Sequence, residues 1–279
     1  MEIRINEQPL DVSLENEKTI GDVLAALDQW LYDSKHILSG LSIDGQKIPA
    51  SLIEEVFTKD INNVKCLDIE TNSVADITTS SLVTLLDDIK EFECLDFSDK
   101  SNFLTDWTKS AAGRFISSEM SDLYKLCVSA FQGDVLMQTL RSIAEERLNE
   151  VNSPVEEFTR IEPVLNEICG KLVDLPLDIQ TGKDMKAAQT VQLFTAITEK
   201  IFRIFYQLDI QDYFNEEQNA DKKNKIIALI NEFTDVLKEL LEAYEKNDSV
   251  LVGDLAEYEA SVRIKELYSV ILKNCRSEK

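Results

Sequence analysis

The chain has a single histidine, and its five cysteines form no Cys-x-x-Cys pair. A Ser-His-Asp or Cys-His catalytic site would therefore have to use His36. His36 follows a predicted helix, where a histidine commonly caps the last carbonyl groups, so we assign it a structural role. The cysteines are odd in number and widely spaced, which indicates reduced thiols and neither a disulfide framework nor a zinc module: Cys66, Cys94, Cys127, Cys169 and Cys275.

Several motifs of nucleotide and metal chemistry are also missing. The sequence contains no Gly-x-x-x-x-Gly-Lys loop, no Gly-x-Gly-x-x-Gly fingerprint and no Glu-x-x-His pair. Their absence argues against P-loop and dinucleotide binding and against the usual di-iron carboxylate site. The sequence therefore indicates no cofactor.

Basic residues are scarce. Lysine and arginine number 29 against 52 aspartates and glutamates, which gives a net charge of −23 and a pI near 4.4. This charge opposes binding to nucleic-acid phosphates and anionic lipid surfaces and favours a basic protein partner. No apolar run reaches the roughly 20 residues that span a bilayer, and no signal peptide is evident at the N-terminus. We expect a cytoplasmic protein that binds neither nucleic acid nor membrane; its oligomeric state stays open.

The first quarter of the chain alternates strand-like and helical patterns. Apolar residues at period two in segments 3–5 and 12–14 predict a β-hairpin with its turn at Gln8-Pro9. A helix capped by Thr19 is expected next. It is followed by two strands joined at Asp44-Gly45, a short helix ending at Phe57, and a strand from residue 64 to 69.

This order of elements resembles the ubiquitin-like β-grasp fold over residues 1–71, and the segment from Leu41 to Ile48 is similar to its central hairpin. Members that act as covalent tags end in an exposed di-glycine, whereas this chain continues through Asn72. Ser42 stands where ubiquitin has part of its apolar recognition patch. The resemblance therefore implies a β-grasp fold and a fused adaptor or structural role.

Beyond residue 72, strand-like alternation gives way to long helical patterns, so we predict two domains, 1–72 and 73–279. Pro163 is expected to kink one helix, and Pro176 and Gly182 to lie in a loop. The fold class is predicted to be α+β: a small N-terminal ubiquitin-like β-grasp domain followed by a larger all-α multi-helix bundle.

Two helices between Asp221 and Lys273 are predicted to form an antiparallel hairpin. The first carries an apolar stripe at spacings of three and four: Ile226, Ile230, Phe233, Leu237, Leu240 and Tyr244. The same spacing on the second selects Leu251, Leu255, Tyr258 and Val262. We expect the two stripes to pack against each other.

The start of the second helix interleaves carboxylates with apolar residues. We predict a contact surface here, in which Tyr258 anchors a partner and Asp254, Glu257 and Glu259 orient it. Aromatic residues are enriched at interfaces, and charged neighbours set the orientation of binding. The alternative is an ordinary half-exposed helix.

A second interpretation concerns carboxylates on both arms of this hairpin. Glu239 with Glu242, and Asp254 with Glu257, have an i, i+3 spacing that resembles the metal-binding carboxylates of all-α nucleotide pyrophosphohydrolases. Helical geometry places the first pair away from the apolar stripe, so a shared Mg²⁺ would need another helix on that face. A solvated helix face is the simpler alternative.

The sequence thus favours a non-catalytic cytoplasmic interaction or assembly factor, similar to an adaptor or chaperone, with an acidic surface suited to a basic protein partner. The alternative is a Mg²⁺-dependent all-α nucleotide phosphohydrolase that uses the helix-borne carboxylates.

Overall fold

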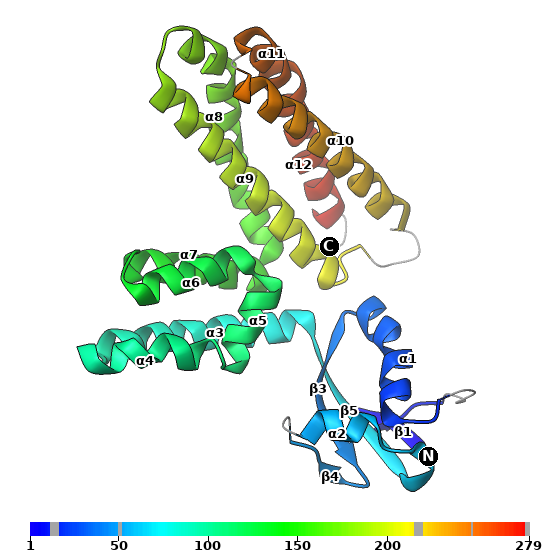
Figure 1. Ribbon diagram of the computed structural model, residues 1–279. Coiled ribbons are helices and arrows are strands. Elements are labelled where there is room, and N and C mark those ends of the chain that lie inside the picture. Colours follow the sequence, from blue (N-terminus) through cyan, green and yellow to red (C-terminus); the bar gives the residue numbers. More distant parts are fainter. Residues whose placement is uncertain (12–16, 50–51, 215–219, 247, 277–279) are drawn as a thin grey trace. The chain divides into compact units, whose positions relative to one another are not determined.

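A computed structural model describes residues 1–11, 17–49, 52–214, 220–246 and 248–276. The chain divides into two compact units, Met1–Ser81 and Leu82–Lys279. The first unit holds a five-stranded sheet, and the second is helical (Figure 1). The predicted α+β class is therefore confirmed. The division between the units falls inside the long helix α3 (Val74–Cys94), which begins directly after the last strand.

The sheet of the first unit has a mixed strand order. Its strands are β1 (Glu2–Ile5), β2 (Gln8–Pro9), β3 (His36–Ile43), β4 (Gln46–Lys47) and β5 (Cys66–Ser73). Their order is β2-β1-β5-β3-β4; β1 runs parallel to β5 and the other pairs are antiparallel. This is the topology of a β-grasp sheet.

Short helices complete the first unit: α1 (Ile20–Asp33), α2 (Ile53–Phe57) and the 3₁₀ turn η2 (Ile61–Asn63). Alternate residues of the strands face α1, because successive side chains of a strand point to opposite faces. The resulting core consists of buried aliphatic side chains from both layers: Ile3, Ile20, Val23, Leu27, Leu41, Ile43, Val64, Leu67 and Ile69.

Local chemistry explains where these elements begin and end. Thr19 caps α1 as predicted: its hydroxyl accepts a hydrogen bond from the Asp22 amide, and the Asp22 carboxylate accepts one from the Thr19 amide at 2.9 Å. The turn predicted at Gln8-Pro9 is wrong, because these residues form β2 and the reversal occurs at Asn6 and Glu7, both with positive φ. The predicted second strand of that hairpin, residues 12–14, lies outside the described residues.

The helix-capping role predicted for His36 is also wrong. Helix α1 ends at Asp33, with Ser34 as its C-cap, so His36 lies in the first position of β3. Its Nδ1 atom is 2.6 Å from the Ser34 carbonyl oxygen. His36 therefore has a structural role, but at the start of a strand.

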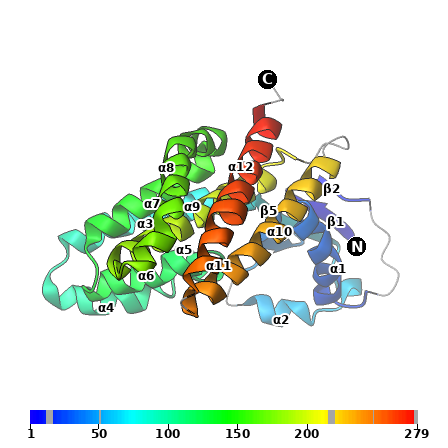
Figure 2. The same cartoon turned by 90° about the horizontal axis from the view of Figure 1, so that it is seen from above.

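The second unit contains two groups of helices with separate hydrophobic cores. The first group is α3, α4 (Phe97–Trp107), α5 (Ala111–Glu119), α6 (Ser121–Gln132) and α7 (Met137–Asn152). The second is α8 (Pro154–Gln180), α9 (Asp184–Ile210), α10 (Ala220–Glu245), α11 (Ser249–Asp254), the π-helix η3 (Leu255–Ala260) and α12 (Ser261–Arg276). Figure 2 shows α12 lying between α8 and α10, and both α11 and α12 contact α8 and α10.

Helix α8 continues through both of its internal prolines. Pro154 occupies its first turn, and the loop expected around Pro176 is wrong, because the helix runs on to Gln180. A proline removes one backbone donor, and the continuous buried face of α8, with Phe158, Leu165 and Leu172, offsets that cost. Gly253 then allows α11 to approach closely, since an added Cβ would lie 2.8 Å from the Pro176 side chain.

The first unit should fold in isolation. A fragment of residues 1–81 contains the complete sheet, α1 and their shared core. We expect a circular dichroism spectrum with strand and helix signals and a cooperative urea transition. A random-coil spectrum for this fragment would show that the sheet needs the helical unit.

All five cysteines are free, as predicted, and Cys127, Cys169 and Cys275 are buried. Within the described ranges, no helix is both long and apolar enough to cross a membrane.

Candidate interaction surfaces

The predicted contact segment lies at the junction of α11 and η3. Tyr258 is 64% exposed and Asp254 is also exposed, whereas Glu257 and Glu259 are half-buried. Glu259 is engaged within the fold, because its carboxylate accepts a hydrogen bond from Arg263 at 2.9 Å. Neither Asp254 nor Glu257 forms an ion pair with another described residue. The structure thus places an aromatic side chain and two carboxylates on one accessible segment.

The apolar stripe predicted for this helix is wrong for three of its four members. Only Leu255 is buried; Leu251, Tyr258 and Val262 are 44%, 64% and 54% exposed. The side chains that face the core are instead Val252, Leu255, Ala256, Ala260 and Ile264.

The π-helix explains this change of face. Consecutive spacings of four residues drift by about 40° per step on an ideal α-helix, so the set from Val252 to Ile264 would leave the core. The wider turns of η3, between Leu255 and Ala260, keep these residues in line. As a result, Tyr258 and Val262 face solvent.

The four carboxylates considered as a metal site do not converge. Glu239 and Glu242 are exposed on α10, and Glu242 accepts a hydrogen bond from Lys246 at 3.2 Å. Among the side chains that the structure describes, no three His, Cys, Asp or Glu residues lie close enough to hold a metal ion. Asp254 and Glu257 therefore do not complete a binding set with the pair on α10.

An apolar groove of about 240 Å³ lies between α9 and α10. Its lining includes Leu175 and Phe194, and the ring of Phe194 packs edge-on against that of Phe233 with ring centroids 6.2 Å apart. The remaining lining comes mainly from the facing sides of the two helices: Leu172, Val191, Thr195, Thr198, Glu199, Phe202, Leu237, Leu240, Leu241 and Tyr244. The sequence interpretation did not identify this groove.

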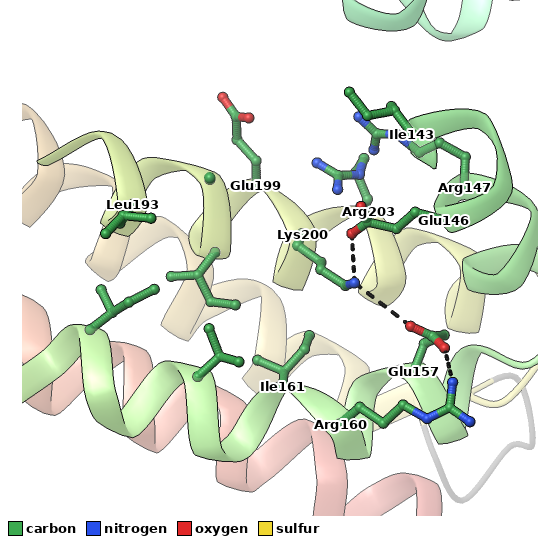
Figure 3. A pocket seen from close by; sticks show the side chains of 14 residues that line it. Ile143, Glu146, Arg147, Glu157, Arg160, Ile161, Leu193, Glu199, Lys200 and Arg203 are labelled. Carbon is green, nitrogen blue, oxygen red and sulfur yellow. Dashed lines mark hydrogen bonds and ion pairs between the residues drawn. The ribbon is translucent and has the colours of Figure 1, made fainter. Parts of the chain in front are cut away.

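A second pocket, of about 400 Å³, lies among α7, α8 and α9 (Figure 3). One part is apolar and includes Ile161 and Leu193. The other part is charged, with Lys200 located between two carboxylates: its Nζ is 2.6 Å from Glu146 Oε1 and 3.7 Å from Glu157 Oε2.

Every basic side chain in this pocket has an acidic partner. Arg203 donates two hydrogen bonds to Glu150, at 3.1 and 3.2 Å, and Arg160 pairs with Glu157. Arg147 pairs with Asp122 on α6, and its Nη1 lies 3.6 Å from Glu150. The pocket therefore has little surplus positive charge for an anion. We define these residues as the interhelical charge network; it joins α7 to α8 and α9.

Glu150 is the most buried member of the charge network, with a side chain only 3% exposed. Burial raises its pKa to about 7, although Arg147 and Lys200 pull the pKa down; Glu146 and Glu157 add to the increase. Loss of solvation disfavours a charged carboxylate, and here it outweighs the nearby cations. Glu150 thus titrates near neutral pH.

Comparison with known proteins gives two partial family matches. Residues 1–73 match the family model described as the TP0873 N-terminal domain. Residues 156–270 match DUF8042, a domain of unknown function. The first match covers the sheet, and the second covers most of α8 to α12, including the apolar groove and η3.

The chain is also similar to an uncharacterized protein of Treponema pallidum (strain Nichols). The two are 23% identical over 273 residues, which is 98% of this chain and 96% of the relative. No solved structure matches the chain significantly. These similarities span both units but name no activity.

Proposed function

We propose that the protein is a non-catalytic cytoplasmic interaction or assembly factor that binds a basic protein partner through the Tyr258 face. This face is defined by Leu251, Asp254, Glu257, Tyr258 and Val262. Its ubiquitin-like β-grasp unit acts as a fused adaptor module.

The observation that carries this proposal is the exposure of three large apolar side chains beside unpaired carboxylates. Leu251, Tyr258 and Val262 are each at least 44% exposed on one helix. The π-helix, an element frequent at functional sites, is what turns Tyr258 outward. Aromatic anchors surrounded by charges are typical of protein interfaces.

The overall charge supports a basic partner. A net charge of −23 attracts cationic surfaces and repels nucleic acids and other acidic proteins. Asp254 and Glu257 add local negative charge beside Tyr258 without compensation by a described basic residue. Opposite charge on the partner would raise the rate of encounter and fix its orientation.

Reversing the charge of the Tyr258 face should slow association. For Asp254→Lys combined with Glu257→Lys, we expect an association rate several-fold to about tenfold lower with the basic partner that co-purifies with the native protein. Raising salt from about 0.05 to 0.5 M should also slow association of the unaltered protein, because the Debye length falls from roughly 14 to 4 Å. Stopped-flow or surface-based kinetics would measure both rates.

The matched control changes the same net charge elsewhere on the helical unit. Glu119→Lys combined with Glu162→Lys alters two exposed carboxylates on α5 and α8. This variant should lose much less of the association rate. Equal slowing by both double variants would leave only a general charge effect and remove the Tyr258 face from the proposal.

A further inference from the structure

Helix α10 carries two apolar stripes, and only one of them is fully used by the core. The buried stripe includes Ile226, Phe233, Val236, Leu240 and Ala243. The second repeats at spacings of three and four along the neighbouring face: Ile227, Ile230, Thr234, Leu237, Leu241 and Tyr244. Its members are half-buried or exposed, with Leu241 52% exposed. A helix that packs on one core needs only one such stripe.

Helix α9 presents a matching stripe across the apolar groove. Val191, Thr195, Thr198 and Phe202 are spaced by four, three and four residues, and all of them line the groove. Both walls of the groove therefore carry side chains at helical spacing, which is the arrangement that packs against a third helix. Between Val191 and Phe202 the wall extends for 11 residues, or about 16 Å, which is about three turns of a docked helix.

One polar group in the groove lacks a partner. Thr198 is 4% exposed, and its hydroxyl makes no hydrogen bond to any part of the chain that the structure describes. Leaving a buried hydroxyl unsatisfied costs free energy. Because this oxygen is itself buried, an occupant of the groove can satisfy it only if the groove wall shifts to expose it.

The groove is bordered by acidic charge. Glu199 lines it on α9, and Glu245 lies one turn beyond Leu241 on α10. Glu232, Asp235 and Glu239 lie on the opposite side of α10 from Leu241 and do not border the groove. The lysine nearest to the groove on α10, Lys238, is paired with Asp235 at 2.9 Å. Lysine or arginine on the flanks of an occupant would therefore be favoured.

We infer that the α9–α10 groove is the docking site for an amphipathic, basic α-helix of a partner protein. Its apolar side chains, at i, i+3 or i+4 and i+7, enter between Val191 and Tyr244, and its lysines or arginines face Glu199 and Glu245. A second copy of this chain is disfavoured, because its own net charge of −23 would oppose the acidic rim. The inference deepens the proposed function by adding a second surface and naming the form of the partner segment.

The test uses the full chain and a synthetic probe. The probe is a fluorescent peptide of about 18 residues built from leucine, alanine and lysine, with leucines at i, i+3, i+4 and i+7. Fluorescence anisotropy should show saturable binding, and circular dichroism should show that the peptide becomes helical. Leu241→Lys should weaken binding at least about tenfold, because it places a cation inside the groove wall.

Val83→Lys on α3 provides the matched control. Val83 is 44% exposed, against 52% for Leu241, and the substitution changes the net charge equally. It should leave peptide affinity within about twofold of the unaltered protein. Because both positions are exposed, thermal unfolding of both variants should match that of the unaltered protein, which separates loss of docking from loss of folding.

Three results would overturn the inference: no saturable binding up to about 1 mM peptide, equal binding of a scrambled peptide of the same composition, or equal weakening by Leu241→Lys and Val83→Lys. A groove that takes an apolar dye but not the peptide would identify a small-molecule site instead. Failure here is distinguishable from failure of the Tyr258 face, because Asp254→Lys with Glu257→Lys should weaken the peptide no more than the charge-matched Glu119→Lys with Glu162→Lys does.

Discussion

Replacing Phe233 by alanine should lower the free energy of unfolding by about 3–5 kcal/mol. The side chain is completely buried, and its ring makes edge contacts with Phe194 and Phe202, with ring centroids 6.2 Å apart in each pair. Removing the ring loses these contacts and leaves a cavity where α9 and α10 meet. Urea unfolding followed by far-UV circular dichroism would measure the change.

Leu237→Ala is the informative comparison, because Leu237 lies one turn further along α10. The sequence stripe treated Leu237 and Phe233 as equivalent core residues, but Leu237 is only half-buried and lines the open groove. Its replacement should cost about 1–2 kcal/mol, since part of its surface already contacts water. Equal losses for the two variants would mean that the groove is closed in solution.

The first arm of the C-terminal hairpin was predictable because its core face follows ideal helical geometry. Ile226, Phe233 and Leu240 are buried as the spacing of three and four requires. The predicted stripe combined two faces of α10, because Ile230, Leu237 and Tyr244 are only half-buried and belong to the second stripe. Sequence periodicity also cannot tell a half-exposed apolar face from a buried one.

The second arm was mispredicted because the stripe through Tyr258 presupposes a constant helical period. Val252, Ala256, Ala260 and Ile264 repeat every four residues, a signal of a wider turn that the stripe through Tyr258 concealed. The resulting error had an unexpected consequence: Tyr258, first assigned to both a packing stripe and a contact surface, is available only for the contact surface. On this segment Asp254 and Tyr258 are exposed, and Glu257 and Glu259 are half-buried.

Part of the sheet was predictable from a local turn signal, because Asp44-Gly45 joins the paired strands β3 and β4. The pairing of β5 with β1 and β3 instead joins distant segments, and only the resemblance to the β-grasp fold implied it. The interhelical charge network has neither kind of signal. Glu150 and Arg203 are 53 residues apart, and Glu146 and Lys200 are 54 apart. With 52 acidic residues in the chain, nothing in the local sequence marks the few that become buried.

Glu150 should make the stability of the helical unit depend on pH in the range from about 4.5 to 8. Burial raises its folded-state pKa to about 7, above the value near 4.5 that it has when unfolded. The folded protein therefore binds this proton more tightly than the unfolded chain does. The contribution of this proton to the free energy of unfolding, up to about 3 kcal/mol, is fully present below pH 4.5 and is lost as the pH rises through 7.

The charged groups that face Glu150 come from four helices: Asp122, Glu146, Arg147, Glu157, Lys200 and Arg203. Glu150→Gln is the right reference because it leaves all of these groups in place. Glutamine keeps the shape and one acceptor oxygen but cannot titrate. The unfolding free energy of the unaltered protein minus that of this variant should fall with increasing pH, whatever this difference is at pH 5.

Arg203→Met should strengthen this pH dependence. Without Arg203, the ionised Glu150 loses its two hydrogen bonds at 3.1 and 3.2 Å, so its charged form becomes still less favourable. We expect a loss of about 3–5 kcal/mol at pH 8 and a smaller loss at pH 5, where Glu150 is protonated. Urea titrations at both pH values would test this. A loss that is the same at pH 5 and pH 8 would show that Arg203 stabilises the protein through packing rather than through the Glu150 charge.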